Sequence, residues 1–126
     1  MLGFRVWDTE NYEFCENTDQ EFYIDRIGYL YELYKRSLIK HKGTRYIPMQ
    51  STGIYDWQDK PIYEGDVLFL YRKTGNNIYY LVENIKDFLI IYGQDYYNIE
   101  KISNDGNIYE CPALLERVKN DNTDEL

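Results

Sequence analysis

Four carboxylates in the middle of the chain are the first residues whose type and spacing could do chemistry. Asp56, Asp59, Glu64 and Asp66 fall within one short stretch, and a cation site or a carboxylate pair for acid–base work would use such residues. Their spacing does not follow a calcium-binding loop, which has a central glycine and a terminal glutamate. We therefore expect them to form turns and to accept backbone hydrogen bonds, Glu64 and Asp66 in particular.

The other reactive side chains are too few and too far apart for a catalytic or metal site. Cys15 and Cys111 are the two cysteines, without a C-x-x-C spacing, and His41 is the single histidine, in a basic segment. This set builds neither a zinc site nor a nucleophile–base pair. Glycine-rich phosphate-binding motifs are also lacking. We predict a protein that is not an enzyme, with no cofactor, and two free thiols rather than a disulfide.

Composition indicates a globular, strand-rich protein. The chain has 126 residues, 44% hydrophobic and 17% aromatic, including fifteen tyrosines, which suit half-buried positions around a small core. The net charge is −8, and this opposes binding to nucleic-acid phosphates. One basic cluster stands out between residues 35 and 45, and its Lys40, Lys42 and Arg45 are the candidate contacts if nucleic acid is bound.

Membrane insertion is not expected. No apolar run approaches the ~20 residues that a spanning helix needs, and the N-terminal residues lack the apolar core of a secretion signal. We expect the protein to stay in the cytoplasm of the cell that makes it.

The first half of the chain alternates between strands and turn-forming residues. Residues 21–34 fit either a helix or a hairpin, and Gly28 with the Phe, Tyr and Ile around it favours the hairpin, with its turn at 26–28. Residues 35–43 are predicted to form a loop or a short turn of helix, and residues 16–20 a turn. Pro48 places its strand at a sheet edge because proline cannot donate a ladder hydrogen bond. The other expected strands are 3–7, 12–15 and 44–50.

The second half is organised around the turn Glu64-Gly65-Asp66, which leads into an apolar strand. Turn signals also occur at 73–77 and 103–106, and Lys86-Asp87 suggests a tight hairpin turn. The continuous apolar run 88–92 predicts a strand covered on both faces, and Pro112 suits the first turn of a helix over 112–118. The expected strands are 66–72, 78–85, 88–92, 96–102 and 107–110.

Short strands separated by turns predict a mainly β protein in which the second half closes into a small barrel. We expect a β-rich N-terminal extension over residues 1–50, the barrel with its short C-terminal helix over 51–118, and a flexible acidic tail over 119–126.

Four short motifs, in order, resemble the pattern of the YopX family of bacteriophage and prophage proteins. They are Phe4-Arg5-Val6-Trp7-Asp8, Met49-Gln50-Ser51-Thr52-Gly53, Ile62-Tyr63-Glu64-Gly65-Asp66-Val67 and the stretch from Gly106 to Leu115. The resemblance implies an SH3-like barrel in the C-terminal half and a bacterial host cell. It implies no activity, catalytic residue or cofactor. Where the family usually has an Asp-Lys-Asn-Gly turn, this chain has Asp56-Trp57-Gln58-Asp59 without the glycine, which leaves the conformation of that turn open.

Trp57 is the most informative single residue, because it occupies a polar loop that does not require it for packing. It either folds back over the end of the barrel or anchors a partner; Trp7, by contrast, is expected in the core. The predicted partner-binding residues are Trp57, Tyr55 and Tyr63. The leading hypothesis is a non-enzymatic module that binds a host or phage protein. The alternative is a nucleic-acid-binding barrel, and self-assembly through exposed strand edges is a third hypothesis.

Overall fold

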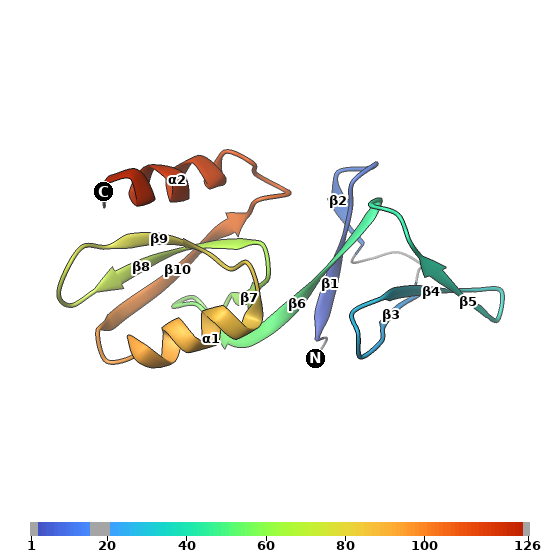
Figure 1. The fold of residues 1–126 in the computed structure, drawn as a ribbon, viewed down its shortest axis with the longest axis horizontal. Helices are drawn as coiled ribbons and strands as arrows, with labels where there is room; N and C mark the ends of the chain where they lie inside the picture. The colour runs from blue at the N-terminus through green and yellow to red at the C-terminus, as the bar shows by residue number, and fades with distance from the viewer. Residues whose placement is uncertain (1–2, 16–20, 125–126) are drawn as a thin grey trace. The chain divides into compact units, whose positions relative to one another are not determined.

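The computed structural model describes residues 3–15 and 21–124, so the turn expected at 16–20 lies outside the described residues. The chain is mainly β with a short C-terminal helix, which confirms the predicted class (Figure 1). In chain order the elements are β1 (Phe4–Asp8), β2 (Glu13–Phe14), β3 (Glu21–Ile24), β4 (Leu30–Tyr34), β5 (Ser37–His41), β6 (Tyr46–Tyr55), β7 (Pro61–Tyr63), β8 (Asp66–Arg72), β9 (Ile78–Leu81), α1 (Ile85–Gln94), β10 (Ile99–Asn107) and α2 (Leu114–Asp124).

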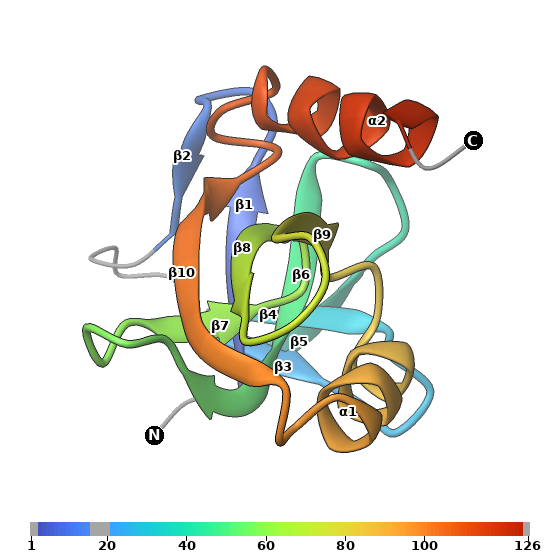
Figure 2. The same cartoon turned by 90° about the vertical axis from the view of Figure 1, so that its left-hand side faces the viewer.

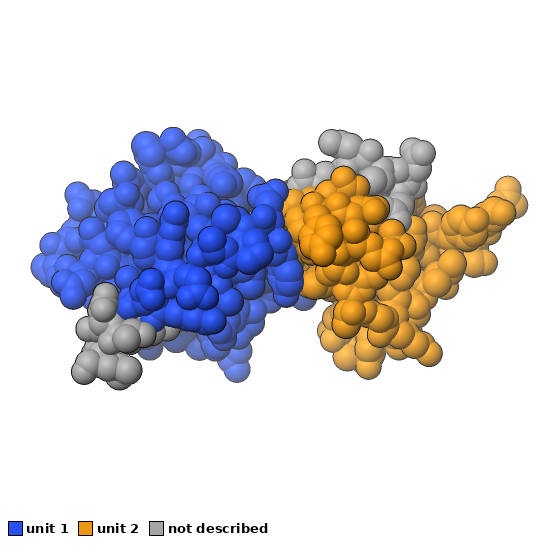
Figure 3. Space-filling model, turned by 90° about the horizontal axis from the view of Figure 1, so that it is seen from above, with its two compact units in different colours: residues 1–3, 50–126 blue, residues 4–49 orange. Residues whose placement is uncertain are grey.

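The chain divides into two compact units, which Figure 3 shows in separate colours. Unit 1 comprises Met1–Gly3 and Gln50–Leu126, and unit 2 comprises Phe4–Met49. The boundary falls inside β6, so this strand contributes residues to both units.

Unit 2 consists of strands and tight turns. In it β1 lies between β2 and the first part of β6, and Trp7 is buried, with the Phe14 ring edge-on at 4.8 Å. The hairpin prediction for residues 21–34 is confirmed, because β3 and β4 pair antiparallel. Gly28 has a positive φ, and the Asp25 Oδ1 atom accepts backbone hydrogen bonds from the turn residues Ile27, Gly28 and Tyr29.

The prediction of a loop or a short helical turn for residues 35–43 is wrong, because β5 occupies most of this segment and pairs with β4. The tight turn between these strands has Lys35 at φ 47° and Arg36 at φ 66°. Turns of this kind normally use Asn and Gly, so two long basic residues gave no turn signal in the sequence. The strand pairing stabilises a local backbone conformation that the residue types alone disfavour.

In unit 1 the three-stranded sheet β10-β8-β9 has a helix packed on each face (Figures 1 and 2). Leu68 and Leu70 of β8 point to the face covered by α1, where Phe88 packs on them. Val67 points to the opposite face and packs on Leu114 of α2. Successive residues of a strand face opposite sides of its sheet, so β8 is buried on both faces.

Residues 85–94 form the helix α1, so the predicted strand 88–92 and the hairpin turn before it are wrong. The predicted strand 78–85 is shorter, ending at Leu81. Asn84 caps the helix: its Oδ1 atom accepts from the Asp87 backbone N–H at 2.8 Å. Phe88 and Tyr92, four residues apart, face the core, whereas Leu89 and Ile90 are 43% and 47% exposed. Residues 88–92 are therefore apolar on both the buried and the exposed face of the helix. The sequence consequently shows no alternation of polar and apolar residues at helical spacing.

The C-terminal third also differs from the prediction. β10 runs unbroken from Ile99 to Asn107, so the predicted turn 103–106 and strand 107–110 are wrong; the strand carries a bulge where Gly106 has φ 133°. α2 begins two residues after Pro112 and continues to Asp124, beyond the predicted end at 118. Residues 119–124 of the predicted flexible tail are therefore helical, and 125–126 lie outside the described residues.

Among the residues that the structure describes, no helix is long and apolar enough to cross a membrane. The SH3-like form of the barrel stays a prediction.

Candidate aromatic binding groove

The central acidic turn is a structural feature, as the sequence indicated. Gly65 adopts φ 86°, and Asp66, which is 1% exposed, accepts the Tyr63 backbone N–H at 2.8 Å through Oδ2. Glu64 accepts the Gln50 backbone N–H at 2.8 Å. Both carboxylates therefore bind backbone donors close to the turn, as predicted for them.

Two asparagines of β10 complete a buried polar network around this turn. Asn104 donates through Nδ2 to Asp66 Oδ2 at 2.9 Å, and Asn107 donates to Asp66 Oδ1 at 3.0 Å. Asn107 also donates to the Glu64 backbone oxygen at 3.3 Å. A buried carboxylate is tolerated only when its oxygens are well hydrogen-bonded. The network therefore fixes the register of β10 against the start of β8.

The loop before this turn is built on Asp56. Its Oδ1 atom accepts the backbone N–H groups of Gln58 and Lys60, each at 2.9 Å, and Oδ2 accepts the Asn104 N–H at 2.9 Å. Burial alone would raise the pKa of Asp56, but these three bonds and the charge of Lys60 outweigh it and hold the pKa below its ordinary value. Asp59 takes the left-handed conformation, φ 61°, at the position where the family pattern has glycine.

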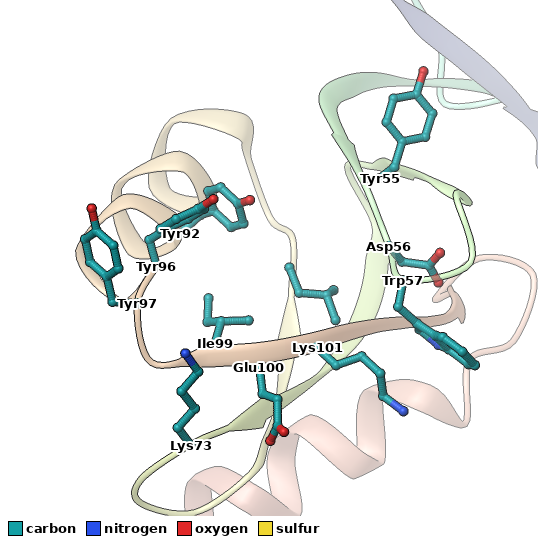
Figure 4. A pocket seen from close by; sticks show the side chains of 11 residues that line it. Tyr55, Asp56, Trp57, Lys73, Tyr92, Tyr96, Tyr97, Ile99, Glu100 and Lys101 are labelled. Atoms are coloured by element: carbon teal, nitrogen blue, oxygen red, sulfur yellow. The ribbon is translucent and has the colours of Figure 1, made fainter.

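Above this framework, unit 1 carries an aromatic groove with a volume of about 380 Å³. Figure 4 shows the arrangement: three tyrosines lie beside the start of β10, Tyr55 and Trp57 lie at the other end of the groove, and β10 runs from the first group toward the second. The aromatic lining residues are Tyr55, Trp57, Tyr92, Tyr96 and Tyr97.

The far side of the groove is a chain of tyrosines that leaves the hydrophobic core. Tyr92 packs at the end of α1 against Phe88, with ring centroids 5.9 Å apart. Tyr96 stands edge-on to Tyr92 at 5.5 Å, and Tyr97 stands edge-on to Tyr96 at 5.4 Å. Exposure rises along this chain to 52% for Tyr96 and 88% for Tyr97. The chain of tyrosines therefore runs from the packed ring of Tyr92 to the largely exposed ring of Tyr97.

Trp57 on the near side is held by its backbone and by a lysine. The backbone N–H of Trp57 donates to the Ile102 backbone oxygen at 2.9 Å. The Lys101 Nζ atom lies 4.5 Å from the centroid of the indole and 4.3 Å from that of Tyr71, a cation–π contact with both rings. The indole is nevertheless 55% exposed. Its position is therefore defined while more than half of its surface stays open to a ligand.

Of the predicted partner-binding residues, Tyr55 and Trp57 lie together in the groove. Tyr63 lies on β7, half-buried, and does not line it. Sequence reasoning missed Tyr92, Tyr96 and Tyr97, because it assigned their segments to strands. The adjacent pair Tyr96-Tyr97, directly after the polar residues at 93–95, was the available signal.

The basic residues proposed for nucleic acid lie in unit 2, and two of them have intramolecular contacts. The Lys40 Nζ atom sits 3.6 Å from the centroid of the Tyr29 ring. Arg45 bonds to the buried Asp8 carboxylate at 3.3 Å and pairs with Glu10 at 3.2 Å. Lys42 is exposed between β5 and β6. Arg45 therefore has a structural role that competes with any ligand.

The reactive side chains do not gather at the groove. His41 bonds to Glu32 at 2.8 Å within unit 2. Cys15 and Cys111 are free thiols, and burial, reinforced by nearby carboxylates, raises the pKa of Cys15. Within residues 3–15 and 21–124, no group of three or more His, Cys, Asp or Glu side chains could hold a metal ion.

The fold and the groove define a small, mainly β protein with two units and an exposed aromatic surface. The chain belongs to the YopX family, whose sequence model, described as YopX protein, matches residues 3–116. Two solved structures are similar. Protein EF1440 from Enterococcus faecalis is 21% identical, with 90% of this chain and 96% of that chain covered and a TM-score of 0.47. Protein yopX from Bacillus subtilis is 17% identical, with 88% and 95% covered and a TM-score of 0.46. No curated protein matches the chain significantly.

Proposed function

We propose that this YopX-family protein is a non-enzymatic module that binds another protein through the aromatic groove of unit 1. The observation that carries the proposal is the exposure of several aromatic residues around one groove: Trp57 is 55% exposed and Tyr97 is 88% exposed. Tryptophan and tyrosine dominate the energetically important positions of protein interfaces, because they bury a large area at little cost in side-chain entropy. Such residues exposed together support an interface better than a packing role.

The charge of unit 1 favours a protein partner over nucleic acid at this groove. Residues 50–126 contain seven Lys or Arg and fourteen Asp or Glu, a net charge of −7. Nucleic-acid binding needs lysine and arginine to neutralise phosphates, and the negative field of unit 1 repels those phosphates. By extension from the family, the partner is a host or phage protein, and binding takes place in the bacterial cytoplasm.

The chemistry around the groove supports a binding role rather than catalysis. The single histidine of the sequence belongs to unit 2, and the Asp56 carboxylate at the groove is occupied by three backbone N–H groups. A general base must be able to reach a substrate proton. Asp56 therefore serves the loop that presents Trp57.

Capture of partners from bacterial lysate tests the proposal, with nuclease-treated and untreated halves compared by mass spectrometry. The tagged wild type is run beside a Trp57→Ala/Tyr97→Ala variant and a control, Tyr34→Ala. Tyr34 lies in unit 2 and is 54% exposed, which matches Trp57. We expect a protein that survives nuclease, is kept by the control and falls at least about tenfold with the groove variant. Equal recovery by the groove variant and the wild type would refute the groove as the binding site.

Nucleic-acid binding through unit 2 is the second candidate, favoured by the local charge. Residues 4–49 carry a net charge of only −1, with Lys40 on a strand and Lys42 exposed beside it. Retention on single- or double-stranded DNA at ~50 mM salt, lost in a Lys40→Gln/Lys42→Gln variant, would support this candidate. Passage through the column at that salt would exclude it, since electrostatic binding is strongest when salt is low.

A further inference from the structure

The charged side chains that line the groove balance one another, so no local ion pair selects its ligand. Lys73 and Lys101 stand against Asp56 and Glu100. Asp56 is saturated by backbone donors, and the Lys101 ammonium already lies over the rings of Trp57 and Tyr71. What the groove offers a ligand is therefore the flat faces and polar tips of its aromatic rings.

The backbone beneath the groove is a poor template for adding a strand. β10 is an edge strand of its sheet, and its outer side faces the groove. Its register shifts between Ile99 and Lys101, and the Ile102 backbone oxygen already accepts the Trp57 N–H. A bulge interrupts the even row of donors and acceptors that an added strand would need. A bound segment must therefore be recognised through side-chain faces rather than a hydrogen-bonded ladder.

We propose, building on the protein-binding role above, that the groove binds a proline-rich segment of its partner in the polyproline II conformation. Such a segment has no internal hydrogen bonds, so its carbonyls remain free for donors such as an indole N–H or a tyrosine hydroxyl. Its rings pack on aromatic faces, and its conformation is fixed before binding, which lowers the entropy cost. Trp57 and Tyr97, at opposite ends of the groove, provide both kinds of contact (Figure 4).

The 126 residues themselves offer no such segment. This chain has three prolines, Pro48, Pro61 and Pro112, each isolated in the sequence. A second copy therefore has no proline-rich stretch to offer. The net charge of −7 on unit 1 also disfavours strongly acidic ligands, which is compatible with a neutral, proline-rich segment.

The test uses a fluorescent decaproline peptide, with a Gly-Ser decapeptide of equal length and a ten-nucleotide oligothymidine as competing probes. Fluorescence anisotropy measures binding to the full chain, and a change in tryptophan emission reports contact with the Trp57 indole. We expect decaproline to bind in preference to both other probes. Trp57→Ala and Tyr97→Ala should each weaken it at least about tenfold, and Tyr34→Ala should leave it unchanged. Tyr97 is 88% exposed, so its variant keeps the fold even if Trp57→Ala does not.

Three results would overturn the inference: decaproline binding no better than the Gly-Ser peptide, equal binding by both groove variants and wild type, or preference for the oligonucleotide. Failure here is distinguishable from failure of the proposed function. A captured protein that needs the groove, together with no decaproline binding, would reject the proline-rich ligand and keep the protein-binding role. Capture that ignores the groove variant would reject both.

Discussion

Asp56→Asn should destabilise unit 1, and the structure gives the size of the effect. The carboxylate of Asp56 accepts three backbone N–H groups, two on Oδ1 and one, from the buried Asn104, on Oδ2. An asparagine keeps one acceptor oxygen for Gln58 and Lys60 but turns an NH₂ group toward the Asn104 N–H. A buried donor without its acceptor costs about 1–3 kcal/mol, and the remaining bonds lose their charge assistance. We expect the free energy of unfolding to fall by about 2–3 kcal/mol.

The matched control is Asp59→Asn, three residues along the same loop. Asp59 is exposed and has φ 61°, a conformation that asparagine tolerates as well as aspartate. Its effect should stay within about 0.5 kcal/mol. Both described helices, α1 and α2, belong to unit 1. Urea unfolding followed by circular dichroism at 222 nm therefore reports this unit.

The pH dependence of stability provides a second test of the hydrogen bonds to Asp56. The pKa of Asp56 is lowered in the folded state, so the stability it contributes is fully present above its unfolded pKa of about 3.9 and is lost as pH falls through the folded pKa. The gap between wild type and Asp56→Asn should therefore narrow below about pH 4. Equal stability of the two asparagine variants at pH 7, or a gap unchanged at pH 3, would refute this account of the loop.

Three further substitutions test other parts of the fold. Asn84→Ala removes the cap of α1 and should cost about 1 kcal/mol in urea unfolding; no loss would mean that tertiary packing alone holds the helix start. Gly65→Ala forces a side chain into φ 86° and should cost about 1–2 kcal/mol; a neutral effect would contradict the turn geometry. Arg45→Ala removes a bond to the buried Asp8: burial raises the pKa of this carboxyl, but Arg45 and the loop N–H groups outweigh burial and hold the pKa below its ordinary value. The Asp8 pKa should therefore rise, so that unit 2 loses stability at a higher pH than wild type, measured by tryptophan emission of Trp7 in a Trp57→Phe background; an unchanged profile would exclude this ion pair as a stabilising contact.

Several features of the fold could be predicted from residue types because the signals were local. Gly28 and its aromatic neighbours identified the hairpin over residues 21–34, and Gly65-Asp66 identified the central turn. The residues now known to cap these turns, Asp25 and Asp66, act within four positions of themselves. Local turn chemistry of this kind is readable from the sequence.

The errors arose where distant partners override local preference. Residues 88–92 looked like a strand buried on both faces, whereas β8 fills that position and α1 covers it. The turn at Lys35-Arg36 carries no turn signal, and pairing of β4 with β5 imposes its shape. Propensity is a weak prior in such places.

The sequence by itself determined the mainly β class and the family, and it singled out Tyr55 and Trp57, two of the residues that line the candidate groove. Those inferences depend on residue types and on the order of short motifs. Only the tertiary structure decided that Tyr96 and Tyr97 line the same groove as Trp57, and that Asn104 and Asn107 donate hydrogen bonds to Asp66. These pairs lie some 40 positions apart in the chain, and the packing of α1 and β10 against β8, not any local pattern, brings them together.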